Sequence, residues 1–257
     1  MGRMQESKIE IAGGSIRLQQ AGDGPLILFL HGAGGASWTP LHKRLSPDWR
    51  VLMPEHPGFG RSAIPDWMMS VGDLAFFYLD LLKQLNLHNV HLVGHSLGGW
   101  IAAEIAIRST QRLASLTLMA PAGIAAADVP FGDIFLWGPE EYARHQFYDQ
   151  RLAEQRLAQP VDLDLLLQNR AATARLAWSP RLHNPQLAYW LHRIDVPTLL
   201  MWGAEDAIVP LACHQAFLRG IPGAELAVLP HTGHALHTEN VEQVADRLNG
   251  FLQGVAR

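Results

Sequence analysis

The sequence contains little cysteine, no long hydrophobic run and no block of like charges. Its one cysteine, Cys213, has no partner within the 257 residues, so no internal disulfide forms and nothing indicates an oxidising compartment. Residues 1–8 are polar and lack the apolar core of a secretory signal, and no apolar run approaches membrane-spanning length. These absences predict a cytoplasmic protein without a membrane span.

Charge clusters and metal-binding motifs are equally sparse. The net charge is −4, and acidic and basic residues are interspersed, which argues against a nucleic-acid partner. The sequence lacks Gly-x-Gly-x-x-Gly, a phosphate loop with Lys-Ser/Thr, and His or Cys spacings with metal-ligand geometry. We therefore expect no cofactor and no metal, with a small molecule as substrate. Both a monomer and a homodimer are compatible with the sequence.

Strands alternate with helices along most of the chain, and 48% of the residues are apolar, enough for a large core. Alternation of this kind predicts an α/β fold with a mostly parallel eight-stranded sheet and helices on both faces. The expected strands are a hairpin over residues 9–20 and the segments 26–30, 50–54, 90–93, 113–119, 198–202 and 226–229.

One long segment departs from this alternation. Residues 131 to about 191 have helical periodicity, contain no expected strand and are rich in Leu, Arg and aromatic residues. We interpret the chain as a core of residues 1–122 and 192–257, interrupted by a helical insertion over residues 123–191.

The stretch Val90–Gly99 carries the strongest functional signal. Apolar residues lead directly into Gly94-His95-Ser96-Leu97-Gly98, and a helical pattern follows. A strand, a sharp turn and a helix around Gly-x-Ser-x-Gly are typical of a nucleophile elbow, in which the serine is exposed at the top of a sheet. A serine hydroxyl needs a base to remove its proton, and that base needs a partner to fix its tautomer.

Loops after three other expected strands offer groups that would complete such a site. His31–Gly35 has three glycines in five residues and can direct a backbone N–H at a developing oxyanion. Asp206 follows the strand 198–202, and His234 follows the strand 226–229. Functional loops of parallel sheets lie beyond the carboxyl ends of the strands, so we expect these loops to meet. Glu205 should point away from the site.

The other histidines near these motifs have simpler interpretations. We expect His95 to be a packed or hydrogen-bonded residue, His231 to be at the surface, and His237 to be near the entry of the last helix.

With these motifs in register, the sequence resembles the α/β-hydrolase fold superfamily from about residue 9 to the C-terminus. The motifs that carry the resemblance are His31-Gly32-Ala33-Gly34, Gly58-Phe59-Gly60-Arg61-Ser62, Gly94-His95-Ser96-Leu97-Gly98, Gly203-Ala204-Glu205-Asp206 and Gly233-His234. The resemblance implies that Ser96 is the nucleophile, His234 the general base and then acid, and Asp206 the orienting carboxylate.

The resemblance also implies further roles. The oxyanion hole would use the backbone N–H groups of Leu97 and Ala33, with Gly34 as the alternative to Ala33. Some relatives place the acid after the preceding strand, which would favour Asp128. The insertion would be a cap over the active site, and its aromatic residues, Trp137 among them, would line an apolar pocket.

The serine selects among the reactions of this superfamily, because the similar haloalkane dehalogenases and epoxide hydrolases need a carboxylate at position 96. We expect a carboxylesterase that cleaves esters of small to medium, partly apolar substrates through an acyl-enzyme.

Two alternatives remain. The first is a carbon–carbon bond hydrolase of aromatic degradation that acts on a vinylogous diketone acid, with Arg170 or Arg175 binding the substrate carboxylate. Many such enzymes have Trp directly after the catalytic histidine, whereas this chain has Ala235. The second alternative is a small-molecule binding or sensing protein with little turnover.

Overall fold

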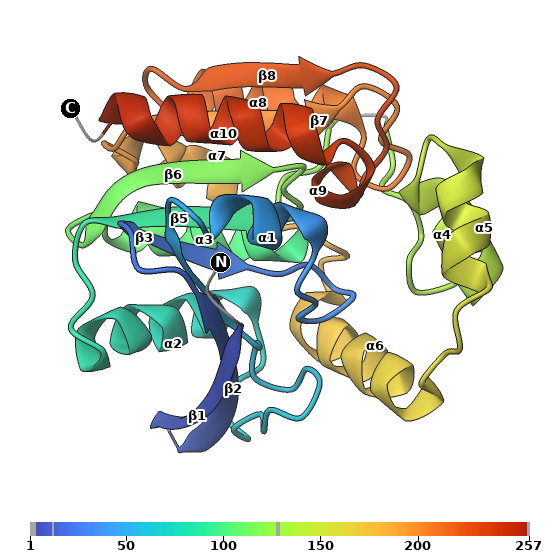
Figure 1. The fold of residues 1–257 in the computed structure, drawn as a ribbon, viewed down its shortest axis with the longest axis horizontal. Helices are drawn as coiled ribbons and strands as arrows, with labels where there is room; N and C mark the ends of the chain where they lie inside the picture. The colour runs from blue at the N-terminus through green and yellow to red at the C-terminus, as the bar shows by residue number, and fades with distance from the viewer. Residues whose placement is uncertain (1–3, 12, 127–128, 256–257) are drawn as a thin grey trace.

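The computed structural model describes residues 4–11, 13–126 and 129–255, and its framework is one eight-stranded sheet (Figure 1). The strand order is β1-β2-β4-β3-β5-β6-β7-β8; β1 and β2 are antiparallel to their neighbours, and β3 to β8 are parallel. The strands are β1 (Gln5–Ile11), β2 (Gly14–Ala21), β3 (Leu26–Leu30), β4 (Arg50–Pro54), β5 (Val90–His95), β6 (Leu113–Met119), β7 (Thr198–Gly203) and β8 (Glu225–Leu229). The predicted fold class is confirmed.

Helices cover both faces of the sheet, as parallel strands require. Figure 1 shows α1 (Pro40–Leu45) and α10 (Val241–Val255) on one face, and α2 (Val71–Gln84), α3 (Leu97–Arg108) and α8 (His214–Gly220) on the other. The central strands β5 and β7 are buried at every position, including the polar residues His91 and His95 of β5 and Thr198 of β7.

Local sequence signals set several helix ends. Ser70 caps α2 in a capping box with Asp73. Helix α1 begins at Pro40, because Thr39 is the N-cap and proline suits the first helical position. A 3₁₀ turn, Leu211–Cys213, leads directly into α8. A short helix, α9 (Leu236–Glu239), precedes α10.

The segment between β6 and β7 contains α4 (Pro139–Gln146), α5 (Gln150–Leu157), α6 (Leu163–Ala177), α7 (Leu187–Trp190) and the 3₁₀ turn Leu191–Arg193. In Figure 1, α4, α5 and α6 lie beside the sheet, near the end at which the arrowheads of β7 and β8 point. We call these three helices the cap. Within the described residues, no helix has the length and hydropathy needed to cross a membrane.

Candidate functional site

Ser96 occupies a strained turn between β5 and α3. Its φ of 55° and ψ of −117° lie in a region where the backbone strain of a residue with a side chain costs about 1–3 kcal/mol. The close approach of strand and helix enforces this turn: a Cβ on Gly98 would lie 2.0 Å from the Leu30 carbonyl oxygen, and one on Gly94 would lie 2.2 Å from the Gly98 oxygen. The elbow predicted from Gly-x-Ser-x-Gly is therefore present in backbone geometry.

Backbone hydrogen bonds hold the strained residue in place. The Ser96 N–H donates to the Met119 oxygen over 2.9 Å, which joins the elbow to the end of β6. The Ser96 carbonyl accepts from the N–H groups of Trp100 and Ala122 at 3.0 and 3.1 Å. These bonds offset the strain of the turn, and the serine side chain is only partly buried.

The loops after β7 and β8 bring Asp206 and His234 together. His234 Nδ1 and Asp206 Oδ2 are 2.8 Å apart, and both side chains are almost fully buried. Asp206 Oδ1 accepts from the N–H groups of Ile208 and Val209 at 2.9 and 2.8 Å. The carboxylate is thus oriented from one side by its own loop and presents its second oxygen to the imidazole. Glu205 points elsewhere, as expected, and its Oε2 accepts from the Thr232 N–H.

The loop after β3 is ordered by hydrogen bonds to one carbonyl. The Gly32 oxygen accepts from His31 Nδ1 at 2.8 Å and from the Gly35 N–H at 3.1 Å. In a trans peptide, the carbonyl and the following N–H point in opposite directions. The Ala33 N–H is therefore directed away from these two donors, and it donates to no acceptor within the described residues.

Neutral, buried imidazoles surround these loops. Burial lowers the pKa of His31 to about 4, and the pKa of His56 lies well below its usual value for the same reason. His95 is also buried; its pKa is lowered mainly by desolvation, and its Nε2–H donates to the His234 carbonyl over 2.9 Å. His95 is thus the hydrogen-bonded residue predicted from sequence, and it holds the backbone of the His234 loop.

The other two histidines also lie as predicted. His237 is in the short helix α9, and His231 is exposed. Asp128, the alternative acid, lies outside the described residues.

Two polar residues that the sequence analysis missed connect the cap to these loops. Asn169 of α6 is buried; its Nδ2 donates to the Gly34 oxygen at 3.0 Å, and its Oδ1 accepts from the Gly60 N–H at 2.9 Å. The Glu239 carboxylate accepts from the Asp149 and Gly233 N–H groups, both at 2.6 Å. Neither residue belongs to a recognisable motif, and only the structure brings them to the site.

The three residues predicted to bind substrate lie in different environments. Arg175 donates through Nε and Nη2 to the carbonyls of Met68, Pro65 and Asp66. Arg170 donates through Nη2 to the Trp137 carbonyl, and its other N–H groups have no hydrogen-bond partner within the described residues. The Trp137 ring stacks on His145 with ring centroids 4.2 Å apart.

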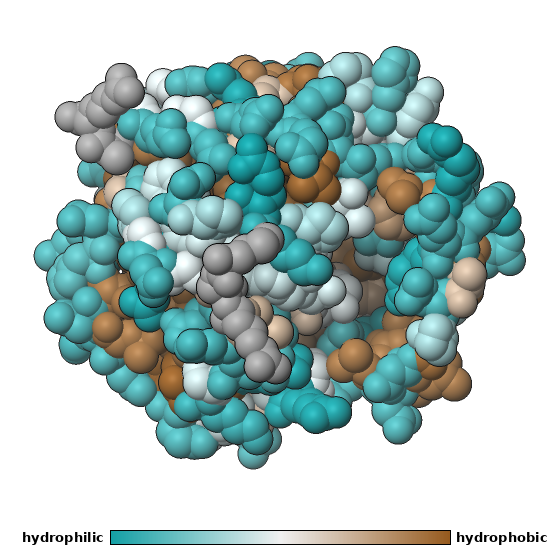
Figure 2. Space-filling view, viewed as in Figure 1, coloured by the Kyte–Doolittle hydropathy of each residue, from teal (hydrophilic) through white to brown (hydrophobic). Residues whose placement is uncertain are grey.

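Several aromatic residues of the segment between β6 and β7 are exposed: Tyr148, Trp178, Tyr189 and Trp190. Figure 2 nevertheless shows a recess with hydrophobic residues between the core near α1 and the cap.

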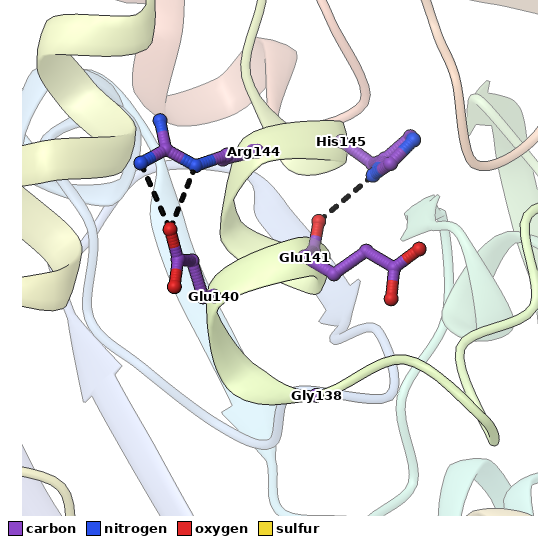
Figure 3. A pocket seen from close by; sticks show the side chains of 5 residues that line it. All are labelled: Gly138, Glu140, Glu141, Arg144 and His145. Carbon is purple, nitrogen blue, oxygen red and sulfur yellow. Dashed lines mark hydrogen bonds and ion pairs between the residues drawn. The ribbon is translucent and has the colours of Figure 1, made fainter.

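A separate surface depression of about 350 Å³ lies on α4 (Figure 3). It is lined by Gly138, Glu140, Glu141, Arg144 and His145. Its polar groups already pair along the helix: Arg144 with Glu140, and His145 Nδ1 with the Glu141 carbonyl. It shares no residue with the loops of Ser96, Asp206 and His234, and we assign it no ligand. Across the described ranges, no group of three or more His, Cys, Asp or Glu side chains is arranged to hold a metal ion.

Comparisons with known proteins agree with this architecture. One relative is the dihydrolipoyllysine-residue acetyltransferase component of an acetoin cleaving system from Pseudomonas putida. It is 31% identical to this chain, and the match covers 96% of this chain and 69% of the relative. A 2-hydroxy-6-oxo-6-phenylhexa-2,4-dienoate hydrolase from Burkholderia cepacia is 28% identical, with 88% and 87% of the two chains covered.

Solved structures share the fold. The meta-cleavage product hydrolase CumD (an A129V mutant) has a TM-score of 0.81 at 23% identity, with 96% and 98% of the two chains covered. Naproxen esterase from Bacillus subtilis has a TM-score of 0.77 at 23% identity, with 97% and 92% covered. Residues 27–247 match the profile of the alpha/beta hydrolase family. This chain, with its elbow, its paired acid and histidine and its cap, belongs to the alpha/beta hydrolase family.

Proposed function

We propose that the protein is a serine hydrolase in which Ser96 is the nucleophile, His234 the general base and Asp206 the carboxylate that orients it. The observation that carries this proposal is the 2.8 Å contact between His234 Nδ1 and Asp206 Oδ2, on loops beside the strained Ser96 turn. A carboxylate on Nδ1 fixes the tautomer in which Nδ1 carries the proton. The Nε2 lone pair is then available to accept the Ser96 proton.

The backbone N–H groups of Leu97 and Ala33 would stabilise the oxyanion. Leu97 is the first residue of α3, so its N–H has no partner within the helix and lies at the positive end of the helix dipole. The Ala33 N–H is directed by the locked Gly32 carbonyl. Two such donors placed where charge develops, each worth about 10²–10³ in rate, are the main electrostatic contribution to acyl transfer.

For the substrate class, we place cleavage of a carbon–carbon bond in a vinylogous diketone acid before ester hydrolysis. The sequence alone favours an ester, but the Burkholderia cepacia relative is named for a hydroxy-oxo-dienoate substrate and is similar over most of both chains. A second relative of the same name, from Comamonas testosteroni, is 28% identical over 89% of this chain. Arg170, whose only hydrogen bond among the described residues is to the Trp137 carbonyl, is the candidate partner for the carboxylate of such a substrate.

The reaction balances without any cofactor. Ser96 Oγ adds to the ketone carbon, and its proton passes to His234 Nε2. The carbon–carbon bond then breaks, and its electron pair enters the conjugated dienolate, which takes the proton from His234. Water, deprotonated by His234, hydrolyses the acyl-enzyme to a carboxylic acid. For 2-hydroxy-6-oxo-6-phenylhexa-2,4-dienoate, the 2-hydroxyl proton first moves to C5, which gives the diketone form; only then does breaking the C5–C6 bond place its electron pair in a conjugated dienolate. The products are benzoate and 2-hydroxypenta-2,4-dienoate.

Carboxylic esters are the second candidate, and the position of Arg175 favours them. Three backbone carbonyls occupy its Nε and Nη2, so it cannot bind a substrate carboxylate with two adjacent nitrogens as a bidentate pair. If Arg170 has a structural role as well, neither of the two arginines is left for an acidic substrate, and a neutral ester fits better.

One substrate screen separates the two candidates. Purified protein is assayed with 2-hydroxy-6-oxo-6-phenylhexa-2,4-dienoate, whose turnover is measured as a loss of absorbance. It is also assayed with a series of 4-nitrophenyl esters from acetate to octanoate. We expect a higher kcat/KM for the dienoate. We expect Arg170→Gln to raise KM for the dienoate at least tenfold and to leave ester KM unchanged, because the ester has no carboxylate to lose its partner. Arg175→Gln is the matched control.

Turnover of esters alone would overturn the carbon–carbon assignment. Covalent labelling of Ser96 without turnover of any substrate would favour a binding or sensing protein.

A further inference from the structure

We infer that Asn169, a residue of the cap, is a positioning residue for the oxyanion hole of the core. The inference rests on the proposed function, because it assigns a task to the Ala33 N–H. It goes beyond the proposal by assigning the cap a part in the chemical step, in addition to shaping a substrate pocket.

The Asn169 amide is fixed in one orientation. Oδ1 accepts from the Gly60 N–H and Nδ2 donates to the Gly34 carbonyl, so rotation by 180° would place donor against donor and acceptor against acceptor. The side chain is 5% exposed, which keeps water from replacing either bond. Within α6, Thr173 Oγ1 donates to the backbone carbonyl of Asn169, one helical turn away.

A continuous chain of hydrogen bonds leads from this amide to the oxyanion donor. Nδ2 holds the carbonyl of the Gly34–Gly35 peptide, and the N–H of that same peptide donates to the Gly32 oxygen at 3.1 Å. The Gly32 oxygen belongs to the peptide whose N–H is that of Ala33. Because each peptide is planar, fixing one end fixes the direction of the other. Asn169 therefore sets the direction of the Ala33 N–H through two peptide planes.

The loop has little else to hold it from the cap side. Gly35 has a φ of +94°, a conformation that residues with side chains rarely adopt, and a Cβ there would lie 2.6 Å from Asn169 Nδ2. A Cβ on Gly34 would meet nothing within 4 Å. A glycine loop with one open side is conformationally soft, and the Asn169 amide supplies the restraint that its sequence lacks.

The test is Asn169→Asp, which keeps the acceptor for Gly60 and replaces the donor to Gly34 with a carboxylate oxygen. Steady-state kinetics on the best substrate are combined with inhibition by a trifluoromethyl ketone that forms a tetrahedral adduct. We expect kcat to fall about tenfold with little change in KM, since an oxyanion contact acts in the transition state; removal of a whole donor costs about 10²–10³. The inhibitor should weaken by the same factor.

Two further observations separate positioning from mere support. As the pH is lowered, the carboxyl group introduced by Asn169→Asp becomes protonated and can donate to Gly34, so the activity ratio of variant to wild type should recover. Thr173→Val, the matched control on the same helix, removes a hydrogen bond that does not reach the loop and should leave kcat and KM unchanged. If Asn169→Asp does not fold, the same assays are made on Asn169→Ala, because this variant buries no charge.

Unchanged kcat and inhibitor affinity in the Asn169 variants would overturn the inference. So would an increase in KM alone, which would mean that Asn169 only shapes the pocket. If Ser96→Ala is inactive while the Asn169 variants match wild type, the inference fails and the proposed function stands. If Ser96→Ala retains full activity, the proposed function itself fails.

Discussion

Replacing Asp206 with asparagine should remove most of the activity without unfolding the protein. Asp206 Oδ1 accepts two backbone N–H groups, from Ile208 and Val209, while Oδ2 faces His234 Nδ1. The asparagine oxygen will keep the two loop donors, because turning the amide would leave both N–H groups facing an NH₂ group. Each buried donor without a partner costs about 1–3 kcal/mol.

In that orientation the amide NH₂ faces His234 Nδ1. The imidazole must then accept at Nδ1 and carry its proton on Nε2, so it cannot take the proton of Ser96. A wrong tautomer in a triad lowers kcat by about 10⁴, equivalent to about 5.5 kcal/mol of transition-state stabilisation. Thermal unfolding should change little, since the two loop hydrogen bonds remain.

The assay is kcat on the best substrate for wild type, Asp206→Asn and Asp128→Asn. The control at Asp128 tests the alternative acid and should retain wild-type activity. Retention of more than about one-tenth of kcat in Asp206→Asn would refute the assignment. Loss of activity in Asp128→Asn instead would move the acid to the other loop.

Further predictions concern stability. Burial lowers the pKa of His31 to about 4, so between about pH 6.5 and 4 the unfolded chain binds more protons than the folded one. The free energy of unfolding should therefore fall as the pH drops through this window. Urea titrations at a series of pH values measure this, and constant stability down to pH 5 would contradict it. Gly98→Ala would force a Cβ to within 2.0 Å of the Leu30 oxygen and should lower Tm by about 6–12 °C, for about 3 kcal/mol of strain, whereas Gly34→Ala meets nothing and should leave Tm unchanged. Scanning calorimetry of both variants measures this, and equal Tm values would show that the elbow tolerates a side chain.

The sequence predicted the strands and the loop order well because those features depend on local signals. The strand Leu26–Leu30 is apolar throughout and is buried between two layers of helices, so its ends are those of its apolar run. Ser70 and Asp73 form a capping box within four residues. Gly94 and Gly98 indicate an elbow because only glycine fits where strand and helix touch.

The contacts between the cap and the core could not be predicted in this way. Asn169 and Gly34 are separated by 135 positions, and an asparagine in a helix has no local feature that distinguishes a buried, hydrogen-bonded side chain from a solvated one. Glu239 bonds the N–H groups of Gly233 and Asp149, which depends on where the cap lies. The exposure of the aromatic residues between β6 and β7 also depends on how these helices pack: Tyr189 is 75% exposed, although its sequence environment is apolar.

The most direct test of the account is whether Ser96 is the nucleophile. The protein is treated with a fluorophosphonate, and the intact mass and the labelled peptide are measured by mass spectrometry for wild type and Ser96→Ala, alongside turnover of the best substrate. We predict one label per chain on Ser96 in the wild type, no label on Ser96→Ala and no turnover above background by that variant. A label on another residue, or undiminished turnover by Ser96→Ala, would contradict the account.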